Sequence, residues 1–433
     1  MHKQQTDNRA LRGDRNFLWL AAGALVSMVG DQFTLIALPW LVLKMTGDPL
    51  VLGTVLAVTS IPRALFILVG GALVDRHSPK RVLMLTKYLN TLLLGALAAL
   101  VFTGHASLPL VYALAFAIGL STAFSIPAGS SIMPHVVRPE HLQQANGAMM
   151  GIRQLSFFIG PLLAGGLIAV SGSASGGMQD AQGLALAFLF DAISYAASAW
   201  TLARVTLRAH PAPAQADAGS VWKSVAEGLR YCWNERSLRV CFAYWAAIAL
   251  FISGPVHVAV PVLAERIGDS AAALGVLVGA HGAGTLLGMM LSGIRPGLRL
   301  RSFGATLLLL DGVIGLLFMP LGLIDATWQG GLLLLAIGML GGVVQVKVYT
   351  WLQRAAPPAL LGRTMALFMF IFLGIAPMSS ALTGLLMRSI ALPQLFAGAG
   401  LLLVAIVGIT YAGSGMRSIQ ESPAPGAVPG TGS

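Results

Sequence analysis

Two charged residues of opposite sign lie deep within apolar stretches of the chain. Asp31 is near the middle of the apolar run 17–43, and Arg63 is near the middle of the run 51–74. A charge at the centre of a bilayer is costly, so such a residue is a functional candidate. Consecutive antiparallel helices would bring the two side chains to similar depth. Asp31 is therefore the first candidate for a proton or cation site, and a permanent buried ion pair with Arg63 is the alternative.

Three other polar residues interrupt later apolar runs. Arg153 lies about a third of the way into the run 145–171, where it could reach the membrane surface or pair. His257 and His281 lie in the seventh and eighth runs. The pKa of a histidine suits a proton relay, and the alternative is a role in helix packing. Arg153 and His281 are retained as proton or substrate candidates.

A cluster of basic residues follows the second apolar run. The segment GGALVDRHSPKRV (70–82) contains Gly71, Asp75, Arg76, Lys80 and Arg81. Small residues let helices approach closely, and an acid near a helix N-terminus can pair with basic side chains. Such a loop could hold two helix bundles together in one state and release them in another. The alternative is the ordinary enrichment of basic residues in cytoplasmic loops.

A glycine and proline motif lies in the fifth apolar run. Gly160, Pro161, Gly165 and Gly166 belong to the segment GPLLAGG. Proline removes a backbone donor and kinks a helix, and glycine permits close packing and bending. The motif therefore indicates either a functional bend or an ordinary packing face.

The sequence lacks the common motifs of enzymes and pumps. It contains no G-x-x-x-x-G-K-[ST], H-E-x-x-H or G-x-S-x-G, and no cluster with metal-ligand spacing. Cys232 and Cys241 have no nearby histidine pattern, and the expected cytoplasmic position argues against a disulfide. We expect no enzymatic activity, no cofactor and no metal.

Composition indicates that lipid surrounds most of the chain. Hydrophobic residues make up 56% of the 433 residues and charged residues only 10%, whereas soluble domains carry about 25% charge. Twelve apolar stretches have the length of about 20 residues that a membrane helix needs. They run over 17–43, 51–74, 82–103, 108–133, 145–171, 182–204, 240–263, 271–293, 302–324, 329–352, 363–387 and 394–413. The sequence therefore predicts an all-α integral membrane protein with twelve spans.

The distribution of basic residues predicts the orientation. With a cytoplasmic N-terminus, 21 Lys and Arg residues fall on the cytoplasmic side, counting Lys87 among them, and 3 fall on the other side. Cytoplasmic loops are enriched in these residues. The net charge of +11 is thereby explained without nucleic acid as a partner. We expect the protein to lie in the inner (cytoplasmic) membrane, with both termini in the cytoplasm.

The longest internal break divides the chain into two halves of six spans. It covers 205–239, begins with a Pro/Ala-rich stretch and continues into an amphipathic one that suits a surface helix. We expect a cytoplasmic tail at 1–16, bundles of six helices at 17–204 and 240–413, this linker between them, and a disordered tail at 414–433.

These features resemble the major facilitator superfamily. The loop 70–82 is similar to its signature G-x-x-x-D-R-x-G-R-R, with Ser78 in place of a glycine and Pro79 intervening. The loop after the eighth span keeps glycine and basic residues but lacks the acid, as expected of two related halves. Residues 160–166 resemble the antiporter motif G-P-x-x-G-G with one extra residue. Further fragments, GDQ at 30–32 and ALPW at 37–40 among them, resemble the branch with macrolide-efflux proteins and the enterobactin exporter.

The resemblance implies roles for several residues. Asp191 and Asp311 fall in spans that are peripheral in this fold, which favours structural hydrogen bonding. Gln345 and Lys347 fall in a span that lines the cavity, where contact with substrate or a gate is one possibility and packing the other. The fourth span lacks the arginine that many drug–proton antiporters carry, so proton coupling by that residue is not implied.

We therefore expect a secondary transporter that works by alternating access, without a cofactor and as a monomer. Its expected partners are a small amphipathic compound, such as a drug, macrolide or siderophore, together with protons and the lipid bilayer. A lysolipid flippase or a metabolite importer of the same fold is the first alternative. A membrane sensor or a membrane enzyme is the second, but the sequence shows neither a soluble output domain nor an interfacial polar cluster.

Overall fold

The computed structural model describes residues 13–76, 78–171, 181–208, 229–268, 270–294, 302–357 and 360–419. Every regular element in these ranges is helical, and twelve helical stretches are long and apolar enough to cross a membrane. The predicted all-α fold with twelve spans is confirmed. Residues 209–228, which include most of the predicted linker and the first part of its amphipathic stretch, are outside the described ranges, as are most of the two predicted tails.

The first six spans are single helices. They are α2 (Arg15–Thr46), α3 (Pro49–Arg76), α4 (Pro79–Phe102), α5 (Leu108–Ser131), α6 (Leu142–Ser171) and α7 (Ala181–Arg204). Local sequence sets their ends. Gly47 closes α2 in the left-handed conformation, with φ of 62°, which glycine adopts without strain. Pro49 and Pro79 open α3 and α4, where the missing N–H has no helical acceptor to lose.

The last six spans are less regular. They comprise α9 (Arg236–Gly254) continued by η3 (Pro255–Ala259) and α10 (Val260–Gly268), then α11 (Ala271–Ile294), α12 (Phe303–Phe318) with η4 (Met319–Leu323), α13 (Thr327–Ala355), α14 (Leu361–Phe370) continued by η5 (Ile371–Ile375) and α15 (Ala376–Leu386), and α16 (Leu392–Gly413). Both η3 and η5 are π-helical turns, and such turns are frequent at functional sites.

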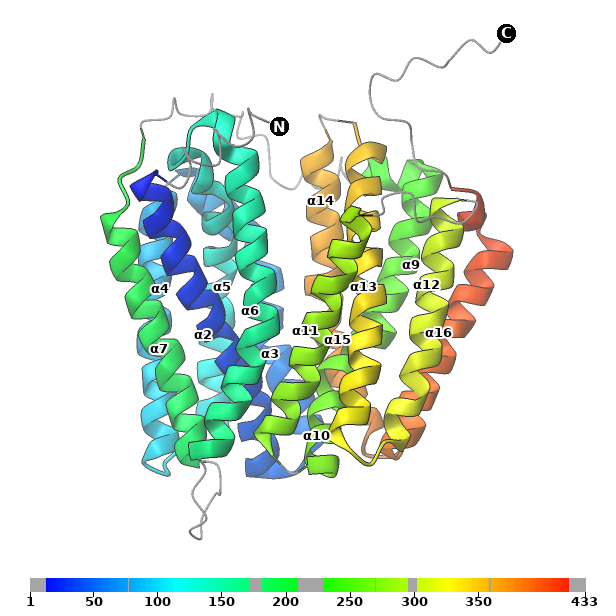
Figure 1. Cartoon of the computed structure of the whole chain (residues 1–433), viewed down its shortest axis with the longest axis horizontal. Helices are drawn as coiled ribbons and strands as arrows, with labels where there is room; N and C mark the ends of the chain where they lie inside the picture. The colour runs from blue at the N-terminus through cyan, green and yellow to red at the C-terminus, as the bar shows by residue number, and fades with distance from the viewer. Residues whose placement is uncertain are drawn as a thin grey trace.

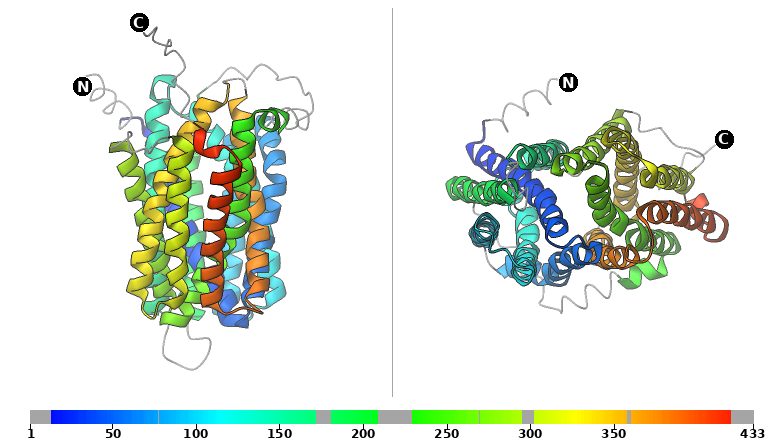
Figure 2. Two further views of the ribbon diagram at one scale, coloured as in Figure 1. Left: turned by 90° about the vertical axis from the view of Figure 1, so that its right-hand side faces the viewer. Right: turned by 90° about the horizontal axis from the view of Figure 1, so that it is seen from below.

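The helices pack as two bundles side by side (Figure 2). In the first bundle α2 and α4 both pack against α7, and α3 packs against α5. In the second, α11 packs against α13, α12 against α16, and α9 against α15. Most of the contact between the bundles is made by two pairs of helices, α6 with α11 and α3 with α15. Any relative movement of the bundles must therefore act on these two pairs.

The bundles are joined more closely at one end than at the other. We call the edge where α2 begins and α16 ends the terminal face, and the edge where α2 ends the opposite face (Figure 1). Near the opposite face a single apolar core includes Leu41 and Ile168 of the first bundle and Leu274 and Phe396 of the second. Toward the terminal face the bundles have separate cores. The structure is thus closed at the opposite face and divided at the terminal face.

Candidate functional site

A polar cluster centred on Asp31 lies inside the first bundle. The Tyr195 hydroxyl on α7 donates to Asp31 Oδ1 over 2.6 Å. Lys87 on α4 acts electrostatically on Asp31, and its Nζ lies 5.6 Å from the centre of the Tyr195 ring. Lys87 Nζ also donates to Ser198 Oγ over 2.6 Å. The three helices that pack together here, α2, α4 and α7, thus each contribute a polar group.

A second carboxylate belongs to the same cluster. Asp191 on α7 is buried, with 1% of its surface exposed, and acts electrostatically with Asp31. It accepts hydrogen bonds from Thr34 Oγ1 and from Ser194 Oγ. The predicted hydrogen bonding of Asp191 is therefore present. Two carboxylates and one ammonium group share this region of low dielectric, where charges interact strongly.

The structure corrects two expectations about these residues. Asp31 does not pair with Arg63, because α2 packs on α6 and α7 far more extensively than on α3. Lys87 is not a loop residue, because it lies about two turns inside α4 and bonds to α7. Lys87 and Tyr195 were missed as site residues. The available signal for Lys87 was its position within the apolar run 82–103.

Arg63 lies at the boundary between the bundles. Its Nη2 donates to Ser60 Oγ over 3.3 Å, and its buried Nε has no hydrogen-bond partner in the part of the chain that the structure describes. Arg63 and His281 both act electrostatically on His257 in the η3 turn. The helix α3 that carries Arg63 packs against both π-helical turns, η3 and η5. Arg63 and His257 therefore lie on elements that meet at this boundary.

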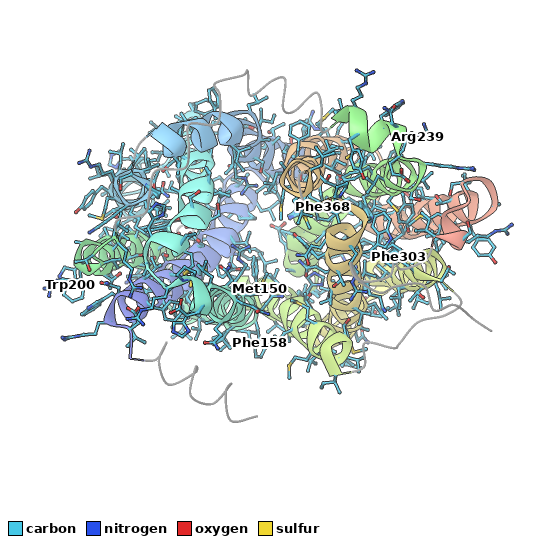
Figure 3. The ribbon with its side chains drawn as sticks, turned by 90° about the horizontal axis from the view of Figure 1, so that it is seen from above. Met150, Phe158, Trp200, Arg239, Phe303 and Phe368 are labelled. Carbon is cyan, nitrogen blue, oxygen red and sulfur yellow. The ribbon has the colours of Figure 1, made fainter. Side chains whose placement is uncertain are left out.

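The other two predicted polar candidates lie closer to the terminal face. Arg153 on α6 is exposed and acts electrostatically on Tyr349 of α13. Gln345, also on α13, is exposed. Figure 3 shows Met150 and Phe158 of α6 at the boundary between the bundles. Arg153 and Gln345 thus lie toward the terminal face, apart from the Asp31 cluster.

The predicted switch loop is described only in part. At residues 71, 75 and 76 the structure describes the backbone but not the side chains. Arg81 is exposed. Lys80 Nζ donates to the carbonyl oxygens of Ala203 and Val205, over 3.1 and 2.6 Å. A cation at these carbonyls stabilises the C-terminal end of α7. The described contacts of Lys80 are therefore within the first bundle.

The glycine and proline motif of α6 lies at the boundary with α11. A Cβ atom at Gly165 would lie 2.6 Å from the Ala271 carbonyl oxygen, and one at Gly275 would lie 2.5 Å from the Pro161 carbonyl oxygen. Gly160 leaves room for the side chain of Gln32 on α2, whereas a Cβ at Gly166 would meet nothing within 4 Å. Three of the four motif residues thus take part in close helix packing.

The α3 and α15 contact is equally close near the opposite face. A Cβ at Gly53 would lie 2.5 Å from the Ser380 carbonyl oxygen, and one at Gly384 would lie 2.6 Å from the Pro49 carbonyl oxygen. These glycines let the two backbones approach. The result is a tight joint between the bundles at this face.

An ion pair reinforces this joint outside the membrane spans. Arg388 Nη2, just after α15, lies 2.5 Å from Asp48 Oδ2 in the turn between α2 and α3. The Arg388 guanidinium, with the backbone N–H of Leu50, holds the pKa of Asp48 below its ordinary value. The pair therefore links the two bundles while Asp48 is ionised.

The second bundle has its own buried carboxylate. The Tyr244 hydroxyl on α9 donates to Asp311 Oδ2 on α12 over 2.7 Å, and both side chains are buried. This contact is the structural hydrogen bond that was predicted for Asp311. Among the described residues, no group of three His, Cys, Asp or Glu side chains could hold a metal ion.

Comparison with known proteins gives a consistent result. A sequence model of the Major Facilitator Superfamily matches residues 20–381. The chain is 28% identical over 420 residues to the enterobactin exporter EntS of Citrobacter koseri, covering 93% of each chain. It is 30% identical over 353 residues to EntS of Escherichia coli (strain UTI89), covering 78% of this chain and 77% of the relative.

Solved structures share the fold at low sequence identity. The nucleoside transporter NupG superposes with a TM-score of 0.70 at 13% identity, over 92% of this chain and 99% of its own. An inward-facing bacterial homologue of the iron transporter ferroportin gives 0.67 at 19% identity, over 92% and 99%. With twelve spans in two bundles and a family match over most of its length, this chain belongs to the Major Facilitator Superfamily of membrane transporters.

Proposed function

We propose that this transporter exports a small amphipathic compound of the siderophore kind from the cytoplasm in exchange for protons. It works as a monomer in the inner membrane, with both termini in the cytoplasm. The relatives named as enterobactin exporters support the direction and the substrate class. The uneven distribution of basic residues, 20 against 3 once Lys87 is placed inside α4, supports the orientation, in which the terminal face is cytoplasmic and the opposite face is external.

The observation that carries proton coupling is the Asp31 cluster. Asp31, Asp191 and Lys87 interact inside one bundle and together hold two acidic groups and one basic group. If all three are ionised, one negative charge is left uncompensated in a region of low dielectric. A proton on Asp31 or Asp191 removes that imbalance. Asp31 is exposed whereas Asp191 is buried, so in this proposal protons reach the cluster through Asp31.

The packing of the two bundles supports a state that is open toward the cytoplasm. The bundles share a core near the opposite face and have separate cores toward the terminal face. In alternating access, substrate enters on the divided side and leaves after the other side opens. With the proposed orientation, this state loads substrate from the cytoplasm.

Transport in inside-out membrane vesicles tests the proposal. Vesicles with the full chain should take up enterobactin when their interior is acidic, and an uncoupler should abolish the uptake. Asp31→Asn should lose uptake driven by the gradient but keep exchange of labelled for unlabelled enterobactin without a gradient. The control Asp325→Asn, at an exposed loop position, should behave as the parent chain does.

Two results would contradict the proposal. Full gradient-driven uptake by Asp31→Asn would remove Asp31 from proton coupling. No uptake of enterobactin or of other siderophores, together with transfer of lysolipid between leaflets, would favour a flippase of the same fold.

A further inference from the structure

We propose that Arg63, with His257 and His281, forms a binding site for an anionic oxygen group of a small organic compound at the boundary between the bundles. This inference rests on the proposed function in one respect, since the anion is taken to be part of the exported compound. It adds a chemical class and a location that the Asp31 cluster does not supply. The site involves both bundles, whereas the Asp31 cluster belongs to one.

The first argument is the incomplete bonding of Arg63. A guanidinium group has five N–H donors, yet among the described residues Arg63 makes one side-chain hydrogen bond, to Ser60, and its buried Nε has no partner there. Among the described residues, no carboxylate forms an ion pair with Arg63. Arg63 is partly buried, and a charge that is withdrawn from water without a partner is costly. A guanidinium in this setting is suited to an anion that supplies the missing acceptors.

The second argument is the shape of the span that faces Arg63. Pro255 has no backbone N–H to donate, and the N–H of the preceding Gly254 donates to Ser379 Oγ on α15 over 2.7 Å. The helix widens here into the π-helical turn η3. Within this turn, Pro255, Val258 and Ala259 are buried, whereas His257 is exposed. The turn therefore presents His257 to open space while its neighbours pack.

The hydrogen bonding of His257 leaves one ring nitrogen available. Its Nδ1 bonds the Ser253 carbonyl oxygen over 2.9 Å, which requires a proton on Nδ1. Nε2 is then free to bind a hydroxyl as an acceptor, or to bind an oxyanion as a donor when the ring is protonated. The buried Nδ1 of His281 also has no hydrogen-bond partner among the described residues.

The three residues lie at similar depth in the membrane. Arg63 is 14 residues after Pro49, His257 is 11 residues before Gly268, and His281 is 10 residues after Ala271. At about 1.5 Å per residue, the three Cα atoms lie about 15–21 Å from the opposite face. The helix α3 that carries Arg63 contacts the turn η3 that carries His257. One bound group could therefore reach Arg63 and His257 together.

The chemistry favours a planar anion with two oxygens. Guanidinium groups bind carboxylates and similar groups through paired N–H···O bonds. The surroundings are apolar, since α3 contacts the turn η5, which is composed of Ile371, Phe372, Leu373, Gly374 and Ile375. An aromatic or aliphatic body that carries such an anion matches both features. We therefore assign the site to the anionic end of an amphipathic compound.

Thermal unfolding of the purified full chain in a neutral detergent tests the site without transport. Benzoate is the anionic probe, and benzamide is its uncharged counterpart of nearly the same shape. Benzoate should raise the melting temperature of the parent chain, and benzamide should not. In Arg63→Gln the benzoate concentration for half of the effect should rise about tenfold or more, and Arg63→Lys should give an intermediate value.

Controls and failures are separable. Arg138→Gln, at an exposed ion pair, should respond as the parent does, and His257→Phe provides a second test should Arg63→Gln not fold. Equal protection by benzamide, by inorganic phosphate or by phosphatidylglycerol would overturn the assignment to an organic anion. Unchanged protection in both Arg63→Gln and His257→Phe would overturn the site. Because no gradient is present, failure of export in vesicles leaves this binding result unaffected, and failure of binding leaves proton coupling at Asp31 unaffected.

Discussion

The tight contact between α3 and α15 allows a quantitative prediction for Gly53→Ala. An added Cβ would lie 2.5 Å from the Ser380 carbonyl oxygen, whereas ordinary van der Waals contact begins at 3.4 Å. The difference, 3.4 − 2.5 Å, requires the two backbones to separate locally by about 0.9 Å. A backbone carbonyl in a helix cannot rotate away as a side chain can, so the cost falls on the joint between the bundles.

The expected magnitude follows from the cost of overpacking. Extra methyl groups in well-packed regions cost about 1–3 kcal/mol, which corresponds to a shift of about 5- to 150-fold between two states. The strained state is the one described here, closed at the opposite face. Gly53→Ala should therefore increase the population that is open at this face by a factor in that range.

Distances between spin labels measure this population. Labels on cysteines placed at His105 and Trp328, which are exposed near the opposite face in different bundles, report the separation there. Cys232 and Cys241 are first replaced by alanine. The matched control is Gly95→Ala on α4, where a Cβ meets no atom within 4 Å. If Gly53→Ala and Gly95→Ala give the same distance distribution, the argument from close backbone contact is wrong.

Three further predictions concern single contacts. The stabilising link between Asp48 and Arg388 is present above the ordinary aspartate pKa of 3.8 and is lost as pH falls through the lowered pKa of Asp48. Acidification below about pH 4 should therefore lengthen the distance between the same spin labels at the opposite face. Asp48→Asn should lengthen this distance at pH 7 and abolish its dependence on pH. Tyr244→Phe leaves the buried Asp311 carboxyl without its donor, so it should lower the free energy of unfolding by about 1–3 kcal/mol in chemical denaturation, whereas Tyr411→Phe at an exposed site should change little. Lys80→Met removes the cation at the end of α7 and should cost about 0.3–1 kcal/mol, seen as faster amide hydrogen exchange in the last turn of α7 and not elsewhere.

The number and order of the spans were predictable because each depends on local composition. Apolar length predicted all twelve, and the break before the third span lies where Pro79 opens α4. Helix bounds differed from the prediction by a few residues, as at α2, which extends to Thr46 and stops only at Gly47. Local signals of this kind act within one turn of the chain, so the sequence alone contains them.

The partners of the buried charges were not predictable, because they depend on how each helix is rotated about its axis. Asp31 and Arg63 are in consecutive spans, yet Asp31 faces α7 and Arg63 acts on His257 in the second bundle. The π-helical turn at His257 was equally hidden, since it involves a hydrogen bond from Gly254 to Ser379, 125 residues later. Helix rotation and such distant contacts follow from the whole packing, which hydropathy does not record.

The neighbouring residues Asp31 and Gln32 couple the rotation of α2 to two different helices. Adjacent residues of a helix point about 100° apart, and here one reaches Tyr195 on α7 while the other fills the space beside Gly160 on α6. A small torsion of α2 must therefore displace both together. The turn that begins at Gly160 includes Pro161, whose carbonyl lies against Gly275 of α11. The acidic cluster and the joint between the bundles are in this way connected through helical backbone. A displacement of one must therefore strain the contacts of the other.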